Sequence, residues 1–167
     1  MILLSKGAKL TLGIPTLEDI KIIAAEIRDS DRKDMEGLHP GSQIEDIILH
    51  DVRHSKVVYG LYMDGEIRGA LGVIPLNTTG TGTPWVVGTS DVDKSPVPFV
   101  RASRKILNML QNSFPVLDTW VCAQNSKSIN WHHWCGFTFD KEKVRIGRDE
   151  YYRAARSAVM KINKEII

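Results

Sequence analysis

The sequence has little that would mark an exported, membrane-bound or nucleic-acid-binding protein. Cys122 and Cys135 are the only cysteines in 167 residues, too few for the disulfide framework of a small secreted domain. Lys6 and Lys9 interrupt the apolar start, so no stretch there is long enough for a signal or membrane helix. The 22 basic and 20 acidic side chains leave a formal charge of +2, too small for a DNA- or RNA-binding surface. We expect a cytoplasmic protein with no nucleic-acid and no membrane partner.

The ligands of a metal site are also missing. His50 and His54 stand four residues apart, the spacing of a zinc-binding pair, but the usual glutamate and a third ligand are absent. We therefore expect no metal. With 43% hydrophobic and 25% charged residues, the chain has the composition and length of one domain, which we place over residues 1–167.

The first part of the chain alternates between strand and helix patterns. Alternating apolar residues predict a strand over residues 10–14. The capping-box pattern from Thr16 to Asp19 predicts the start of a helix. A polar loop is expected over residues 29–41, followed by a helix that Ser42 would cap.

The middle of the chain reads as a group of strands. The pair Asp64-Gly65 is a two-residue hairpin signal, which predicts antiparallel strands over residues 57–61 and 67–74. A flexible connection is expected over residues 77–84, and a short apolar strand over residues 85–89 would be central in the sheet.

The remaining part alternates again, and the whole order predicts an α/β (α+β) fold. The expected elements are a helix over residues 99–114, a strand over 117–122, a helix opened by Asn125, a strand-rich segment over 138–146, and a final stretch over 151–167. Alternation in that final stretch favours a strand, although its composition favours a helix.

The segment from Asn125 to Phe137 resembles a motif of the GNAT acetyltransferase superfamily. In that motif an Asn after a strand opens a helix, a small and an aliphatic residue follow, and Gly-Phe closes it; here these are Asn125, Ser128, Ile129, Gly136 and Phe137. The resemblance implies a central mixed, mostly antiparallel sheet flanked by helices. It also implies a slot for the pantetheine arm of acetyl-CoA, whose acetyl group goes to an amine.

A closer resemblance is to phage-encoded GNAT-like proteins, a family that includes the internal virion protein A of T7-like phages. It is carried by residues 27–32, 84–91 and 101–104, together with the segment from Asn125 to Phe137. This resemblance implies a virion or host-cytoplasm location and a phage or host protein as partner.

One part of the GNAT pattern is missing. Active members resemble one another in a loop of type Gln/Arg-x-x-Gly-x-Gly/Ala, whose amides hold the cofactor pyrophosphate. The equivalent residues 91–99 contain no glycine, and Pro96 and Pro98 have no amide proton to donate. Two hypotheses follow: an acetyltransferase with a degenerate pyrophosphate loop, and a non-catalytic virion or host-interaction protein.

The resemblance also implies which residues form the site. The residues predicted to contact the cofactor are Val87, Thr89, Ser90, Lys94, Arg101, Arg104 and Asn125. The three cations would meet phosphates, although a solvated basic face is the more ordinary interpretation. His132 occupies the position of the tyrosine that protonates the leaving thiolate, and Asp91 is the best placed general base. The alternatives are a packed imidazole and a turn carboxylate.

Overall fold

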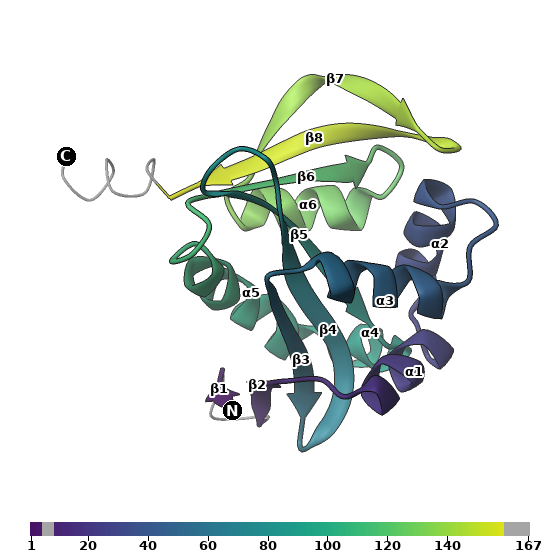
Figure 1. The fold of residues 1–167 in the computed structure, drawn as a ribbon, viewed down its shortest axis with the longest axis vertical. Coiled ribbons are helices and arrows are strands. Elements are labelled where there is room, and N and C mark those ends of the chain that lie inside the picture. The colour runs from purple at the N-terminus through teal and green to yellow at the C-terminus, as the bar shows by residue number, and fades with distance from the viewer. Residues whose placement is uncertain (5–8, 159–167) are drawn as a thin grey trace.

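The computed structural model describes residues 1–4 and 9–158, which form eight strands and six helices (Figure 1). The strands are β1 (Ile2–Leu3), β2 (Leu10–Gly13), β3 (Val57–Met63), β4 (Glu66–Pro75), β5 (Thr81–Gly88), β6 (Val116–Cys122), β7 (Thr138–Ile146) and β8 (Asp149–Ser157). The helices are α1 (Leu17–Ala25), α2 (Asp29–Leu38), α3 (Ile44–His54), α4 (Ser90–Lys94), α5 (Pro96–Leu110) and α6 (Ser126–Trp134).

All eight strands form one sheet in the order β1-β2-β3-β4-β5-β6-β8-β7. Every neighbouring pair is antiparallel except β5 and β6, which run parallel. The prediction of a mixed, mostly antiparallel sheet flanked by helices is therefore confirmed.

The sheet has a separate hydrophobic core on each face. On one face α1 and α3 pack through residues such as Ile23 and Ile48 against Val87 of β5. On the other face α5 packs through residues such as Ile106 against Leu117 and Val121 of β6. Figure 1 shows α3 in front of the sheet and α1 beside the lower part of β4, with α2 near the turn between β7 and β8.

Several predicted ends are confirmed by their local chemistry. The Thr16 hydroxyl accepts from the Asp19 amide while the Asp19 carboxylate accepts from the Thr16 amide, which is a complete capping box. Asp64 and Gly65 make the β3–β4 turn with positive φ angles of 51° and 84°. Asn125 caps α6 by accepting from the Ser128 amide at 3.0 Å.

The loop expected over residues 29–41 is wrong, because residues 29–38 form α2. Side-chain pairs at helical spacing explain the difference: Arg28 bonds Asp31 at 2.7 Å, and Lys33 lies 3.6 Å from Asp29. Ser42 does not cap α3; Gln43 is the N-cap and makes no side-chain capping bond.

Two other boundaries differ from the prediction, and one predicted strand is confirmed. Strand β5 begins at Thr81, inside the segment expected to be flexible, because Gly82 fits against Val73 at a distance that admits no side chain. A short helix, α4, precedes α5, which begins at Pro96 instead of Phe99. The strand predicted at the start of residues 151–167 is confirmed as part of β8, and residues 159–167 lie outside the described part of the chain.

Candidate functional site

The parallel pair β5 and β6 is joined over two residue pairs only. Thr81 is opposite Val116 and Gly82 is opposite Leu117, and beyond these pairs no register is kept although both strands continue. We call the unpaired parts, residues 83–88 of β5 and 118–122 of β6, the fork. The fork exposes one edge of β5 in the middle of an otherwise continuous sheet, so backbone amides and carbonyls there lack a strand partner.

The edge of β5 that faces the fork belongs to its even-numbered residues. Thr89 donates to the Arg68 carbonyl at 2.8 Å, so the odd-numbered peptide groups point towards β4. Pro84 has no N–H to offer on the fork side, and Gly88 is already hydrogen-bonded there. Val86 is left with its peptide group towards the fork and a side chain that is 46% exposed.

The peptide group of Gly88 is held by the chain just after α1. The Arg28 amide donates to the Gly88 carbonyl at 3.0 Å, and the Gly88 amide donates to the Asp31 carboxylate at 2.8 Å. One residue further, the Ser90 amide donates to the Glu26 carbonyl at 2.9 Å. These bonds occupy the end of the β5 edge that faces the fork.

Asp31 is the most buried carboxylate of this arrangement, with a side chain 12% exposed. Burial raises the pKa of Asp31, while the Arg28 guanidinium, which donates to it at 2.7 Å, and the Gly88 amide counter that effect. Arg28 also lies 3.9 Å from Asp93 of α4. The pair of Arg28 and Asp31 thus ties α2 to the end of β5 and to α4.

On the opposite side of the fork, α2 contacts the start of α6. The Asn125 amide group donates to the Asp34 carboxylate at 2.9 Å while its oxygen caps α6. Burial raises the pKa of Asp34, and the carboxylates of Asp31 and Asp149 raise it further. A half-buried carboxylate with a raised pKa is suited to accept a proton.

Beneath α2, Tyr151 and Asp149 of β8 converge at Gly37. A Cβ placed on Gly37 would lie 2.5 Å from an Asp149 carboxylate oxygen and 3.2 Å from the Tyr151 hydroxyl. Tyr151 is 1% exposed, and its hydroxyl has no hydrogen-bond partner among the described residues. Burial raises the pKa of Tyr151 to about 12, so the phenol stays protonated. A neutral hydroxyl without a partner is costly to bury.

The structure brings some of the predicted cofactor residues to the fork. Val87 and Thr89 are fully buried in β5 and just after it, and the Thr89 hydroxyl has no partner within the described chain. Ser90 is exposed at the first position of α4. Asn125 is partly buried between α2 and α6. Contact of these four residues with a cofactor stays a prediction.

The predicted base Asp91 lies in ion pairs. Its carboxylate contacts Lys94 at 2.8 Å and Arg68 at 3.0 Å. The hydrogen bond from Lys94 lowers the pKa of Asp91, so the carboxylate is a poor proton acceptor. The same pair engages Lys94, which was expected to contact phosphate.

The predicted phosphate cations on α5 have different surroundings. Arg104 donates twice to the Trp134 carbonyl of α6, and its guanidinium lies 3.9 Å from the centre of the Trp134 ring. Arg101 is exposed on the first part of α5. At the start of α5, Pro96 and Pro98 have no amide proton and the Ser95 amide is bonded to the Asp91 carbonyl, so these three positions cannot hold a phosphate with their amides.

His132 packs among aromatic side chains of α6 and β7. Its Nδ1 lies 2.7 Å from the Ser128 carbonyl, and its ring contacts Phe137 and Phe139 edge to face. A carbonyl only accepts, so Nδ1 carries the proton and Nε2 of the neutral ring is an acceptor. Burial lowers the pKa of His132, which favours this neutral form. In it, Nε2 has no proton to give a thiolate.

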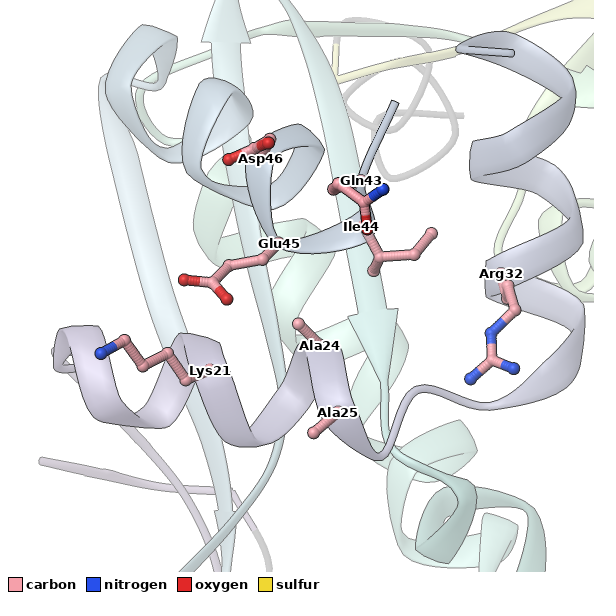
Figure 2. Close-up of a pocket in the computed structure, with 8 residues that line it drawn as sticks. All are labelled: Lys21, Ala24, Ala25, Arg32, Gln43, Ile44, Glu45 and Asp46. Carbon is pink, nitrogen blue, oxygen red and sulfur yellow. The ribbon is translucent and has the colours of Figure 1, made fainter. Parts of the chain in front are cut away.

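Two concave regions lie outside the fork. The larger, of about 540 Å³, is a cleft between α1, α2 and α3, and Figure 2 shows Lys21 and Arg32 on its walls with Glu45 and Asp46. Its mixture of cations and carboxylates singles out no class of ligand. A smaller pocket of about 240 Å³ lies between α6 and β8 and includes His133 and Tyr152.

The described part of the chain contains neither a metal-binding cluster nor a membrane-spanning helix. Within residues 1–4 and 9–158, no group of three or more His, Cys, Asp or Glu side chains is arranged to hold a metal ion. His50 and His54 stack on one another at a ring distance of 4.1 Å. In the same residues, none of the helices has the length and hydropathy to cross a membrane.

Solved structures with the same fold are GNAT N-acetyltransferases. An aminoglycoside acetyltransferase in complex with coenzyme A shares 13% identity at a TM-score of 0.70, over 93% of this chain and 99% of that one. A GNAT-family acetyltransferase from Bacillus anthracis shares 10% identity at a TM-score of 0.65, over 95% of this chain and 99% of that one. PaiA N-acetyltransferase from Thermoplasma acidophilum, also in complex with coenzyme A, shares 12% identity at a TM-score of 0.62, over 89% of this chain and 98% of that one.

The fold is therefore the GNAT acetyltransferase fold. No family model and no curated protein matches the sequence, and identities of this size establish the fold alone.

Sequence reasoning missed the acidic side of the fork. Asp31 and Asp34 fell in a predicted loop, and Tyr151 was treated as part of an ambiguous terminal segment. The signal for the first two was available: Arg28 and Asp31 stand three residues apart in a stretch without proline, a pattern typical of a helix. No signal placed Tyr151 beneath α2, because that contact depends on the β6–β8 pairing.

Proposed function

We propose that this chain is an N-acetyltransferase that moves an acetyl group from acetyl-CoA to an amine at the fork. The observation that carries the proposal is the edge of β5 at Val86. The Val86 peptide group faces the fork and has no strand partner there, and the Val86 side chain is exposed. An amide-containing chain such as pantetheine can hydrogen-bond to such an edge as an added strand would. The coenzyme A complexes of two proteins with this fold support the choice of cofactor.

Few charged side chains are free to contact the cofactor. Val87, Thr89 and Asn125 surround the fork, and Ser90 and Arg101 lie towards the start of α5. Lys94 and Arg104 reach phosphates only by leaving Asp91 and Trp134. We therefore expect acetyl-CoA to bind mainly through its acetyl-pantetheine portion and more weakly than a phosphate cradle would allow.

Asp34 is the proposed proton acceptor in place of Asp91. The acceptor ammonium loses one proton to the Asp34 carboxylate, and the lone pair of the neutral amine attacks the thioester carbonyl carbon. The C–N bond forms, the C–S bond breaks, and the leaving sulfur takes up the second proton that the nitrogen releases, giving an amide and free coenzyme A. The raised pKa of Asp34 brings the carboxylate closer to this task than the ion-paired Asp91.

A second function is supported by the bonds at Gly88. Its N–H and C=O, the groups next along the fork edge, are already bonded to Asp31 and Arg28, and α4 stands where the pyrophosphate loop is expected. A chain that keeps the fold but fills its cofactor edge would act as a non-catalytic interaction protein. Under this alternative the partner would be a phage or host protein, in the virion or the host cytoplasm.

Calorimetric titration with acetyl-CoA separates the two functions. We expect saturable binding by the unchanged protein. Asp31→Ala should bind about 5- to 10-fold more tightly, because it frees the Gly88 amide to donate to a pantetheine carbonyl. A tenfold change in affinity corresponds to about 1.4 kcal/mol, the size of one hydrogen bond. The matched control is Asp29→Ala, an exposed carboxylate on the same helix turn, which should bind as the unchanged protein does.

Absence of binding in both the unchanged protein and Asp31→Ala, with both folded by circular dichroism, would contradict the enzyme and favour the interaction protein. Dephosphorylated acetyl-pantetheine serves as a second ligand. Affinity similar to that of acetyl-CoA would agree with recognition of the acetyl-pantetheine portion.

A further inference from the structure

Asp34, Asp149 and Tyr151 lie close together where α2 covers the end of β8. Among the described residues, the Tyr151 hydroxyl has no hydrogen-bond partner. The Asp149 carboxylate and the Tyr151 hydroxyl both lie against the backbone of Gly37, so close that a side chain at this position would not fit. Asp34 stands one helical turn away on α2, and its electrostatic effect on Tyr151 places it in the same cluster. We call Asp34, Asp149 and Tyr151 the acidic subsite.

The charge of the acidic subsite is negative and only partly balanced. Asp31 has the Arg28 guanidinium beside it at 2.7 Å, which satisfies that carboxylate. Among the described residues, Asp34 accepts a hydrogen bond from the neutral Asn125 amide, and the nearby Arg28 cation, which favours its ionised form, is already paired with Asp31. Asp149 adds a second carboxylate close enough to affect Asp34. A cation between Asp34 and Asp149 would therefore gain from both.

The buried Tyr151 hydroxyl is an independent sign of a missing partner. Its residue is 1% exposed and the hydroxyl neither donates nor accepts a hydrogen bond within the described residues. An orphaned buried hydroxyl is unfavourable for folding and is seldom kept without a function. An ammonium group has three N–H donors, so it can serve two carboxylates and a phenol oxygen together.

We propose that the acidic subsite binds the primary alkylammonium group of the acceptor, beside the fork where the acetyl group is held. Asn125 holds the Asp34 carboxylate from the α6 side of the subsite, and this carboxylate both binds the ammonium and accepts its proton. The assignment as an acceptor subsite rests on the proposed acetyl transfer. Binding of the ammonium itself does not, and it can be measured without a cofactor.

The experiment measures affinity in the absence of acetyl-CoA. The probes are 1,4-diaminobutane, a free diamine, and Nα-acetyl-lysine methylamide, which presents the same ammonium as a protein side chain does. The neutral 1,4-butanediol is the control ligand. Each is titrated into the unchanged protein and followed by amide chemical shifts. We expect saturable shifts at Gly37 and Tyr151 with at least one amine probe and none with the diol.

The variants identify the groups involved. Asp34→Asn and Asp149→Asn should each weaken amine binding about tenfold, because each loses one charge-assisted bond of the ammonium. Asp140→Asn, an exposed carboxylate of β7, is the matched control and should leave affinity unchanged. Equal affinity in all of these variants, or no amine binding by the unchanged protein, overturns the inference.

Tyr151→Phe gives a readout that a purely structural residue would not. Removing an unsatisfied hydroxyl should raise the melting temperature by about 2–4 °C, while the amine affinity falls several-fold. Tyr152→Phe, the neighbour on the opposite face of β8, should show neither change. A loss of stability together with unchanged amine affinity in Tyr151→Phe contradicts the subsite.

The two proposals fail in different ways. Amine binding at the subsite without any acetyl-CoA binding would leave the subsite in place and remove the acetyl transfer. Acetyl-CoA binding without amine binding would do the opposite. A stronger response to the lysine derivative than to the diamine would identify a protein side chain as the source of the ammonium.

Discussion

At Gly88 a single peptide group determines how much of the β5 edge is available. Its amide and carbonyl face the fork and are bonded to Asp31 and Arg28, whereas the next peptide group along, at Val86, has no strand partner. The same few atoms therefore support both functions proposed above. Whether a ligand displaces the Asp31 carboxylate depends on one hydrogen bond to a charged group, worth about 1.5–3 kcal/mol.

Residue identities in the site were predictable where the sequence motif fixes local geometry. Asn125 caps α6 as its position before the helix suggested. Asp91 follows β5 as predicted, but Lys94 and Arg68 engage its carboxylate. The ion pair between Arg68 and Asp91 cannot be predicted from the sequence, because the register of β4 and β5 brings these two residues together. Roles that depend on tertiary contacts could not be assigned from the sequence.

The buried imidazole of His132 predicts how stability depends on pH. Its pKa is lowered in the folded protein, so between the folded value and the ordinary value of about 6.5 the unfolded chain binds the extra proton. Stability from this group is therefore present above pH 6.5 and is lost as the pH falls below it. We expect His132→Leu to lose less free energy of unfolding than the unchanged protein when the pH drops from 7.5 to 5.5.

Urea unfolding at the two pH values measures this difference directly. His39→Leu, at an exposed position, is the control and should keep the full pH dependence. An unchanged pH dependence in His132→Leu would mean that the imidazole titrates normally and is available as an acid.

At the scale of elements, the strands and helices with strong periodic patterns were predicted and the polar ones were not. The capping box of α1 and the Asp64-Gly65 turn lie where the sequence placed them. Helix α2 was predicted as a loop because its sequence is polar and has only one fully buried position, Gly37. Beside the local pair of Arg28 and Asp31, contacts with β5, α6 and β8 stabilise the helix, and these contacts leave no pattern in the sequence.

A buried polar network joins three elements below the fork. Arg156 of β8 donates to the Cys135 carbonyl after α6, to Gln111 after α5, and to Asn108 of α5. Gln111 in turn donates to the Arg156 carbonyl at 2.9 Å. The guanidinium satisfies acceptors that have little access to water, so its loss leaves several of them without a partner.

We therefore expect Arg156→Met to lower the free energy of unfolding by about 3 kcal/mol, since several buried acceptors lose a charged donor. Lys33→Met removes an ion pair with Asp29 in which both side chains are more than three-quarters exposed, and the expected loss is at most about 1 kcal/mol. Denaturant unfolding of both variants tests the difference. Equal losses would show that the network does not join the elements as described.

For the whole molecule, the order of elements was enough to predict the sheet, and the structure adds where it opens. The GNAT fold was expected from the segment from Asn125 to Phe137, and neighbours with TM-scores of 0.62 to 0.70 confirm that fold. The arrangement of α2 across the fork was not predictable, because it depends on Arg28 and Asp31 meeting Gly88 from far along the chain. The phage relationship stays a prediction.

The most direct test of acyl-CoA binding at the fork is hydrogen exchange at two neighbouring amides of β5. In the free protein the Val86 amide, without a strand partner, should exchange quickly, and the Gly88 amide, bonded to Asp31, slowly. Saturating acetyl-CoA should slow exchange at Val86 by about tenfold or more, because the acetyl-pantetheine portion becomes its hydrogen-bond acceptor. Unchanged exchange at Val86 under acetyl-CoA would contradict the account, and would leave the fold as a scaffold for an interaction protein.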